Sequence, residues 1–228
     1  MTPTICPKGT MCGSQSTVVV PCPLGTYQDQ PGSSTCKPCL AGHYCDVSAD
    51  TGTIYPALCS AGTACPNSTV VPTPCAAGYY QSSAGSSSCL VCPSGYYCGD
   101  PLGTVTPIAC GPGTKCVEKS VVPASCNPGT YQDSSRSSEC QVCREGYYCP
   151  EGSSTAMIDC PAGSSCVAGS VTVSPCAVGH YQSEPRSSSC LVCPDGYYCD
   201  KIGTVTPLPC PPGSKCASGV HQVLPVCI

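Results

Sequence analysis

Cysteine is the residue type of this chain that could do chemistry, and its spacing limits what that chemistry is. The chain has 27 cysteines among 228 residues. Cysteine thiolates bind zinc, exchange with disulfides or pair into structural bridges. Four C-x2-C pairs have the spacing of zinc or redox motifs: Cys36 and Cys39, Cys89 and Cys92, Cys140 and Cys143, and Cys190 and Cys193. Zinc modules gather four ligands close in sequence, usually in reducing compartments, and a thioredoxin-type pair occurs once in a βαβ unit. Structural disulfides are therefore the predicted use of these residues.

The other chemistry-bearing side chains form no recognisable catalytic set. His43, His180 and His221 do not share one position of the repeat described below, and no serine lies in a nucleophile elbow. We therefore expect the protein not to be an enzyme, and we expect no catalytic residue, no metal and no cofactor.

The cysteines follow one repeated pattern. From Cys6 the spacing is C-x5-C-x9-C-x13-C-x2-C-x5-C, and it restarts at Cys59, Cys110, Cys160 and Cys210, in steps of 53, 51, 50 and 50 residues. A period this regular predicts a linear array whose units contact mainly their neighbours. The predicted organisation is a partial repeat truncated at its N-terminus over 1–21, full repeats over 22–74, 75–125, 126–175 and 176–226, and the truncated start of a further repeat at 227–228.

A shorter motif predicts the elements inside each repeat. Segments opening C-x-x-G recur thirteen times, about every 17 residues. Proline often follows the cysteine, which would place Pro at i+1 and Gly at i+3 of a type I turn. Short tyrosine-containing or β-branched segments flank these turns, and helical periodicity is absent. The predicted fold is small and disulfide-rich: an elongated rod of tandem ~50-residue cysteine-rich repeats, built from short β-hairpins and turns with essentially no helix.

Composition predicts the compartment. There is no Phe or Trp, so a 50-residue unit can bury little apolar surface without crosslinks. Disulfides in this number persist only under oxidising conditions, which predicts an extracellular or cell-surface location. Only 10% of residues are charged and the net charge is −4. No basic patch is present to attract nucleic acid, and no apolar run in this segment is long enough for membrane insertion.

Three segments carry a resemblance to a known family. CPSGYYC (92–98), TVTPIAC (104–110) and CPLGTYQDQPGSSTCKPC (22–39) resemble the ephrin-receptor-like cysteine-rich repeats, whose relatives are the tumour-necrosis-factor-receptor repeats. The resemblance extends over essentially the whole chain. It implies a scaffold and says little about activity, because such repeats occur in receptors, matrix proteins and surface proteins alike. Each unit also departs from the simplest form of the family by an added C-x5-C turn, as in Cys110 to Cys116.

The resemblance implies a disulfide pairing that spacing alone does not select. In this receptor-like phase the pairs are Cys22 with Cys36, Cys39 with Cys59, Cys45 with Cys65, Cys75 with Cys89, Cys92 with Cys110, Cys98 with Cys116, Cys126 with Cys140, Cys143 with Cys160, Cys149 with Cys166, Cys176 with Cys190, Cys193 with Cys210, and Cys199 with Cys216. Cys6, Cys12 and Cys227 are left over. A competing phase closes each C-x5-C locally, for example Cys6 with Cys12.

One modification site and a structural role complete the predictions. Asn67-Ser68-Thr69 is an N-glycosylation sequon, and the Ser and Thr residues of the proline-containing loops are candidate carriers of O-linked glycans. Because the Tyr, Gly and Cys positions recur in every unit, we expect a structural segment of an extracellular glycoprotein that forms or decorates a cell-surface filament or coat. Its expected partners are further copies or other extracellular structural proteins. The alternative is the ligand-binding rod of a receptor or adhesion ectodomain.

Overall fold

The described part of the chain folds into thirteen consecutive two-stranded antiparallel hairpins, as seen in a computed structural model. The structure describes residues 5–13, 18–46, 52–152, 154–222 and 224–225. Every strand is two residues long, and no helix occurs in these ranges. Nor do they contain a helical segment of the length and hydropathy needed to cross a bilayer. The predicted small, disulfide-rich fold of tandem hairpins is confirmed.

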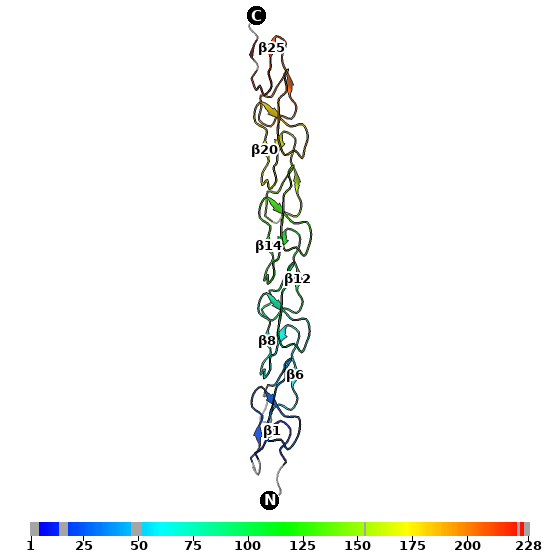
Figure 1. Cartoon of the computed structure of the whole chain (residues 1–228), viewed down its shortest axis with the longest axis vertical. Coiled ribbons are helices and arrows are strands. Elements are labelled where there is room, and N and C mark those ends of the chain that lie inside the picture. Colours follow the sequence, from blue (N-terminus) through cyan, green and yellow to red (C-terminus); the bar gives the residue numbers. More distant parts are fainter. Residues whose placement is uncertain (1–4, 14–17, 47–51, 153, 223, 226–228) are drawn as a thin grey trace. The chain divides into compact units, whose positions relative to one another are not determined.

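The hairpins form two compact units. Unit 1 comprises Met1–Ala109 and Val117–Val122, and unit 2 comprises Cys110–Cys116 and Pro123–Ile228. Within each unit the hairpins follow one another in sequence order, as the colour gradient of Figure 1 shows. The repeat boundaries predicted from the cysteine spacing stay a prediction.

Three types of hairpin alternate, each opening with a C-x-x-G turn. Type A opens at Cys22, Cys75, Cys126 and Cys176; type B opens at Cys39, Cys92, Cys143 and Cys193; type C opens at Cys6, Cys59, Cys110, Cys160 and Cys210. The type A pairs are β3 (Thr26–Tyr27) with β4 (Lys37–Pro38), β9 (Tyr79–Tyr80) with β10 (Leu90–Val91), β15 (Thr130–Tyr131) with β16 (Gln141–Val142), and β21 (His180–Tyr181) with β22 (Leu191–Val192).

The other two types have the same register, with the first strand directly after the turn glycine. The second strand lies directly before the next opening cysteine, except in the last hairpin, where it ends at Pro225, two residues before Cys227. The type B pairs are β5 (His43–Tyr44) with β6 (Ala57–Leu58), β11 (Tyr96–Tyr97) with β12 (Ile108–Ala109), β17 (Tyr147–Tyr148) with β18 (Ile158–Asp159), and β23 (Tyr197–Tyr198) with β24 (Leu208–Pro209). The type C pairs are β1 (Thr10–Met11) with β2 (Val20–Pro21), β7 (Thr63–Ala64) with β8 (Thr73–Pro74), β13 (Thr114–Lys115) with β14 (Ala124–Ser125), β19 (Ser164–Ser165) with β20 (Ser174–Pro175), and β25 (Ser214–Lys215) with β26 (Leu224–Pro225).

The turn that opens each hairpin lies one residue later than predicted. The amide of Thr26 donates to the carbonyl of Pro23 at 3.1 Å, so the turn runs from Pro23 to Thr26. Gly25 then occupies position i+2 with φ +76°, the position at which a type II turn requires positive φ. The predicted type I turn, with Pro at i+1 and Gly at i+3, was wrong. The glycine therefore lies within the turn, at the position where the backbone needs positive φ.

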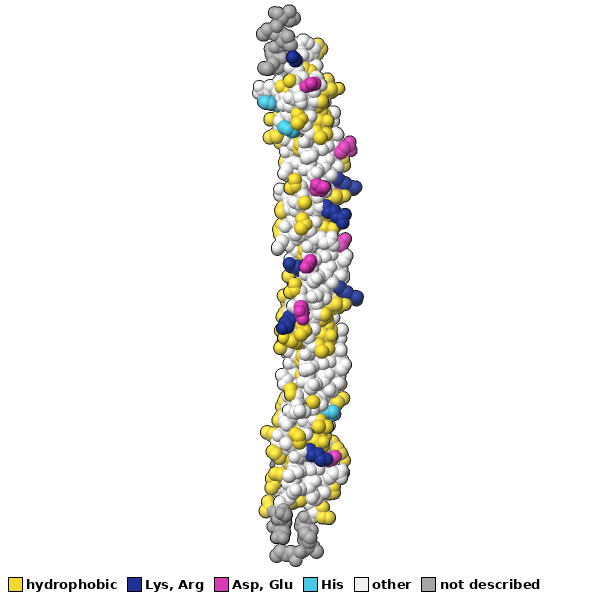
Figure 2. All heavy atoms as spheres, viewed as in Figure 1, with side chains coloured by type: hydrophobic (Ala, Val, Ile, Leu, Met, Phe, Trp, Pro, Cys, Tyr) yellow, Lys and Arg dark blue, Asp and Glu magenta, His cyan; other side chains and the backbone are white. Residues whose placement is uncertain are grey.

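The core consists of sulfur and a few polar side chains. Apart from cysteine, the buried hydrophobic residues of the described part of the chain are Ala64 and Tyr131. Large apolar residues lie outside, as with Leu102 at 81% exposure, and Figure 2 shows apolar side chains scattered over the surface of both units with few charges among them. The hairpins therefore owe little to apolar burial.

Neighbouring hairpins are joined by a repeated pair of backbone hydrogen bonds. The Gly25 amide donates to Cys45 O in the next hairpin at 3.2 Å, and the Cys39 amide returns a bond to Gly25 O at 2.8 Å. The same exchange recurs at Gly42, where the Gly42 amide donates to Cys65 O and the Cys59 amide donates to Gly42 O. The same pair of bonds is seen at eleven of the thirteen turn glycines, which are thus the points where one hairpin attaches to the next.

A second contact reaches two hairpins along the chain. Most of the described loops turn a corner at a residue with positive φ, and in most hairpins the amide of that corner residue donates to the opening cysteine carbonyl of the preceding hairpin, as Ser68 does to Cys39 at 2.8 Å. The corner carbonyl also lies against the turn glycine two hairpins earlier. A Cβ on Gly78 would meet Lys119 O at 2.7 Å. At Gly78 the turn glycine is therefore required by close backbone approach as well as by its φ, whereas a Cβ on Gly196 or Gly213 would meet nothing of the described chain within 4 Å.

Candidate functional site: the disulfide framework and the Asn67 loop

Thirteen disulfides join 26 cysteines, all within single hairpins. Type A hairpins close C-x13-C pairs, which are Cys22–Cys36, Cys75–Cys89, Cys126–Cys140 and Cys176–Cys190. Types B and C close C-x5-C pairs, which are Cys6–Cys12, Cys39–Cys45, Cys59–Cys65, Cys92–Cys98, Cys110–Cys116, Cys143–Cys149, Cys160–Cys166, Cys193–Cys199 and Cys210–Cys216. Cys227 lies outside the described residues.

The receptor-like pairing holds in type A hairpins and fails in the others. The predicted type A pairs are those of the structure. The pairs Cys39 with Cys59 and Cys45 with Cys65 were wrong, as were their equivalents, which are Cys92 with Cys110, Cys98 with Cys116, Cys143 with Cys160, Cys149 with Cys166, Cys193 with Cys210, and Cys199 with Cys216. The competing local phase is correct for every described C-x5-C segment. Cys6 and Cys12, expected to be left over, pair with each other.

The physical reason for local closure is the geometry of the first strand. After the turn the chain makes only two strand residues, so the cysteine six positions on returns beside the opening cysteine. The Cα atoms of Cys39 and Cys45 are 6.0 Å apart, within the range a disulfide spans. The two cysteines of each C-x2-C motif belong to different disulfides. Cys36 is bonded to Cys22, and Cys39 is bonded to Cys45. The same division at the other three motifs leaves every C-x2-C cysteine in a disulfide.

In type A hairpins a glutamine occupies the position of the missing second cysteine. Gln28, Gln81, Gln132 and Gln182 lie six residues after the opening cysteine and are 2–6% exposed. The Gln81 Nε2 donates to Ser88 O at 2.8 Å, and its Oε1 accepts the Ser83 amide at 3.1 Å. This buried amide braces the loop that Cys89 closes. The sequence signal was that glutamine and the second cysteine share one position, six residues after the opening cysteine, which the prediction of short tyrosine-containing strands did not use.

Charged side chains form local pairs with neighbouring polar or aromatic groups. Lys37 Nζ lies 2.6 Å from Asp29 Oδ1, and this hydrogen bond lowers the pKa of Asp29 and raises that of Lys37. Lys119 lies 5.3 Å from the centre of the Tyr79 ring, and its hydrogen bond with Tyr79 raises the Lys119 pKa. Arg186 similarly lies 5.7 Å from the Tyr147 ring. These two cations are corner residues at positive φ, so their side chains reach back over the tyrosine two hairpins earlier.

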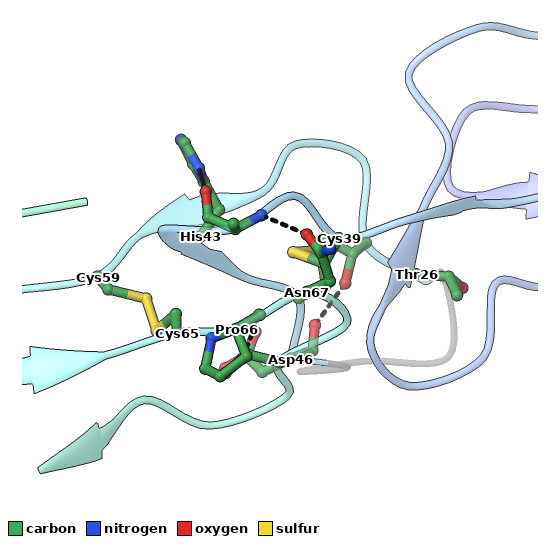
Figure 3. Close-up of a disulfide and its surroundings, with 12 residues drawn as sticks. Thr26, Cys39, His43, Asp46, Cys59, Cys65, Pro66 and Asn67 are labelled. Atoms are coloured by element: carbon green, nitrogen blue, oxygen red, sulfur yellow. Dashed lines mark hydrogen bonds between the residues drawn. A yellow bond between two sulfur atoms is a disulfide. The ribbon is translucent and has the colours of Figure 1, made fainter. Parts of the chain in front are cut away.

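The Asn67 loop is held in one conformation by the preceding hairpin. Figure 3 shows Asn67 beside Cys39, on the loop that follows the Cys59–Cys65 disulfide. Asn67 is exposed, and its Oδ1 accepts the Ala41 amide at 2.9 Å. Because a backbone amide can only donate, Oδ1 must face Ala41, and Nδ2 is left on the other side of the group.

The rest of the sequon is also fixed in the folded loop. Ser68 adopts φ +61° with its amide bonded to Cys39 O, and the Thr69 hydroxyl donates to Pro66 O at 2.6 Å. Asn67 Oδ1 thus joins two hairpins through its hydrogen bond with Ala41, and Asn67 Nδ2, the atom to which an N-glycan would be attached, does not take part in that bond. A glycan on Nδ2 would leave the Ala41 hydrogen bond intact.

The comparisons with known proteins agree with this architecture. A curated rat protein, "Sushi, von Willebrand factor type A, EGF and pentraxin domain-containing protein 1", is 32% identical over an alignment of 171 residues, and the match covers 63% of this chain and 4% of the rat protein. The mouse protein of the same name is 36% identical over 94 residues, covering 39% of this chain and 2% of the relative. The chain thus spans only a few per cent of the length of these relatives. No protein-family model matches it.

Structure and comparison together support a coarse assignment. Disulfides in tandem hairpins along the described chain and the similarity to a protein named for its Sushi, von Willebrand factor type A, EGF and pentraxin domains indicate an extracellular or cell-surface cysteine-rich repeat array.

Proposed function

We propose that this chain is a non-catalytic scaffolding segment of an extracellular glycoprotein, one that forms or decorates a cell-surface filament or coat. The observation that carries the proposal is the uniformity of the hairpins. The same turn, the same disulfides and the same neighbour hydrogen bonds recur along the chain, whereas binding surfaces normally concentrate their energy in a few distinct aromatic or arginine anchors. The ephrin-receptor-like type of repeat is the family we propose for these units.

The low charge of the chain supports a covered surface. Only 10% of its residues are charged, while Leu58, Val71 and Ile108 are more than half exposed. Isolated soluble domains generally carry more charge than this. Glycans or further copies of the chain would cover such a surface, and both occur in a coat.

The direct test is electron microscopy of native material labelled with an antibody against this chain. A polymer or continuous surface layer carrying the label supports the proposal. Dispersed single molecules, each bound to a different protein, contradict it. That second outcome is the one expected of a ligand-binding rod in a receptor or adhesion ectodomain, a candidate favoured by the similarity to a multidomain relative.

The proposal includes an N-linked glycan on Asn67. Transfer to this residue would precede closure of the hairpin, because the folded loop commits the Thr69 hydroxyl to Pro66 O. Enzymatic removal of N-glycans from secreted protein should lower its mass, and should convert Asn67 to Asp. The variants Asn67→Gln and Thr69→Ala should both lack the mass difference, whereas Ser68→Ala should retain it. An unmodified Asn67 in secreted, folded protein would contradict this part of the proposal.

A further inference from the structure

The disulfides of this chain differ in how far they are shielded from solvent. The C-x5-C pairs between Cys39 and Cys199 are closed on both sides, with every cysteine 0–1% exposed. In the C-x13-C pairs the opening cysteine is equally buried, at 1–2%. Its partner is only half-buried in all four cases, namely Cys36, Cys89, Cys140 and Cys190. Cys12 and Cys210, in the first and last pairs of the described chain, are also half-buried and are left out of the comparison.

The contrast follows from the hairpin types. In types B and C the second cysteine comes directly after the first strand, where the next hairpin covers it: the Cys45 amide, for example, donates to Thr69 O. In type A that covered position belongs to glutamine. The second cysteine is displaced to the end of the loop, just before the exposed second strand, as Cys89 is before Leu90 and Val91.

We propose that the four C-x13-C disulfides are sites of thiol–disulfide exchange with a low-molecular-mass thiol of the glutathione class. The thiolate attacks the sulfur of the less buried cysteine of the pair, which is Cys36, Cys89, Cys140 or Cys190. The bond to the opening cysteine breaks and a mixed disulfide forms at the attacked sulfur. The opening cysteine leaves as a thiolate and takes up a proton, so the number of thiols is unchanged.

The type A hairpin has the contacts to stay folded when its bridge opens. Gln81 bonds Ser88 O and the Ser83 amide independently of Cys89, so the loop remains braced next to the modified sulfur. The β9–β10 pairing and the Gly78 amide bond to Cys98 O also remain. Exchange is therefore a local and reversible event that recurs once in each type A hairpin, and it does not depend on the proposed role in a filament.

The test is to expose the full, oxidised chain to graded ratios of reduced to oxidised glutathione under native conditions. The reaction is quenched with acid, free thiols are alkylated, and adducts are mapped by mass spectrometry of peptides. We expect glutathione on Cys36, Cys89, Cys140 and Cys190, with opening at least about tenfold faster than at Cys92–Cys98, because exchange depends on access to the attacked sulfur. Circular dichroism should not change while these adducts form.

A variant that loosens one of the four type A loops provides the matched comparison of exchange rates. In Gln81→Ala the adduct at Cys89 should form faster, while the rates at Cys36, Cys140 and Cys190 in the same molecule stay unchanged. Because those three loops report on the fold of the variant, a general folding defect would be recognised by a rise at all four sites. Equal or faster opening of the C-x5-C pairs, adducts on the opening cysteines, or no reaction before the whole chain unfolds would each overturn the proposal.

Discussion

The turn glycines carry two constraints that substitution can separate. Gly78 has φ +82° and lies against Lys119 O, Gly213 has φ +80° with open space around its Cβ position, and Gly111 has neither constraint. Gly213→Ala should cost about 1–2 kcal/mol from the left-handed backbone alone. Gly78→Ala should cost a further 1–3 kcal/mol, roughly, because the backbone carbonyl must move. Hydrogen exchange of the affected hairpin measures both.

Gly111→Ala is the control for these variants. It should be neutral or stabilising by about 0.4–1 kcal/mol, because alanine reduces the freedom of the unfolded chain without strain in the folded one. Equal losses at Gly78 and Gly213 would show that the approach of Lys119 O is unimportant.

Sequence reasoning at this scale identified the residues more readily than their roles. The glycine of C-x-x-G was visible as a turn residue, but its place in the turn depends on which carbonyl accepts the Thr26 amide, and no residue type specifies that. The glutamines were visible too. That these glutamines occupy the position of a cysteine becomes visible only when the three hairpin types are aligned on their opening cysteine. Their hydrogen bonds to the backbone could not be predicted from the sequence, because the acceptor and donor groups come together only in the folded loop.

The hairpins, as elements, are coupled by side chains at the corners. Lys119 is held at φ +64° with its amide bonded to Cys92 O, and its ammonium lies over Tyr79. Lys119→Ala keeps the backbone strain and loses the ring contact, so a small loss of stability is expected. Lys119→Gly loses the same contact but removes a strain of about 1–2 kcal/mol, and should be at least as stable as the natural chain.

A double-mutant cycle isolates the ring contact from the backbone effect. In a Tyr79→Leu background, Lys119→Ala should have almost no further effect on the protection of the type A hairpin that opens at Cys75. An unchanged loss in that background would mean that Tyr79 is not the partner through which Lys119 acts.

Single disulfides should stabilise their own surroundings only. Replacing the pair Cys143 and Cys149 by alanine removes a bridge across six positions, a loss of about 2–2.5 kcal/mol in the chain-entropy model. Hydrogen bonds reach the adjacent hairpins and corner contacts reach one further. Reduced amide protection is therefore expected in the hairpins that open between Cys110 and Cys176, and peptides from residues 22–74 should be unaffected. Loss of protection along the entire chain would contradict local coupling.

The pairing of these elements shows where sequence reasoning reaches its limit. Spacing predicted short hairpins around the recurring C-x-x-G turns, and the family resemblance implied the type A disulfides, which close within one such segment. The receptor-like pairing of Cys39 with Cys59 failed because it assumed the covalent pattern of a relative for units that contain an added C-x5-C turn. Six cysteines allow fifteen pairings, and the selection depends on strand length, here two residues, which no propensity predicts.

At the scale of the whole molecule, stability should grow with the number of joined hairpins. Two shortened chains test this: residues 22–74, with three hairpins, and residues 6–109, with six, which contain only complete disulfides as the structure pairs them. In the shorter chain the hairpin at Cys59 has no following partner for the Gly62 amide, which in the longer chain donates to Gln81 O at 2.7 Å. The Gly42 turn likewise loses the corner at Gly85, two hairpins on.

Each hairpin buries almost no apolar surface of its own. The contacts between hairpins should therefore contribute, together with the disulfides, a large share of the free energy that opposes local opening of a hairpin. The hairpins at Cys39 and Cys59 should therefore exchange their amides more slowly in 6–109 than in 22–74, while the hairpin at Cys22, which keeps both following neighbours in each chain, should differ less. Hydrogen exchange followed by mass spectrometry resolves the three hairpins. Identical protection in the two chains would mean that each hairpin is stabilised by its own disulfide alone, and the array would then be a string of independent modules.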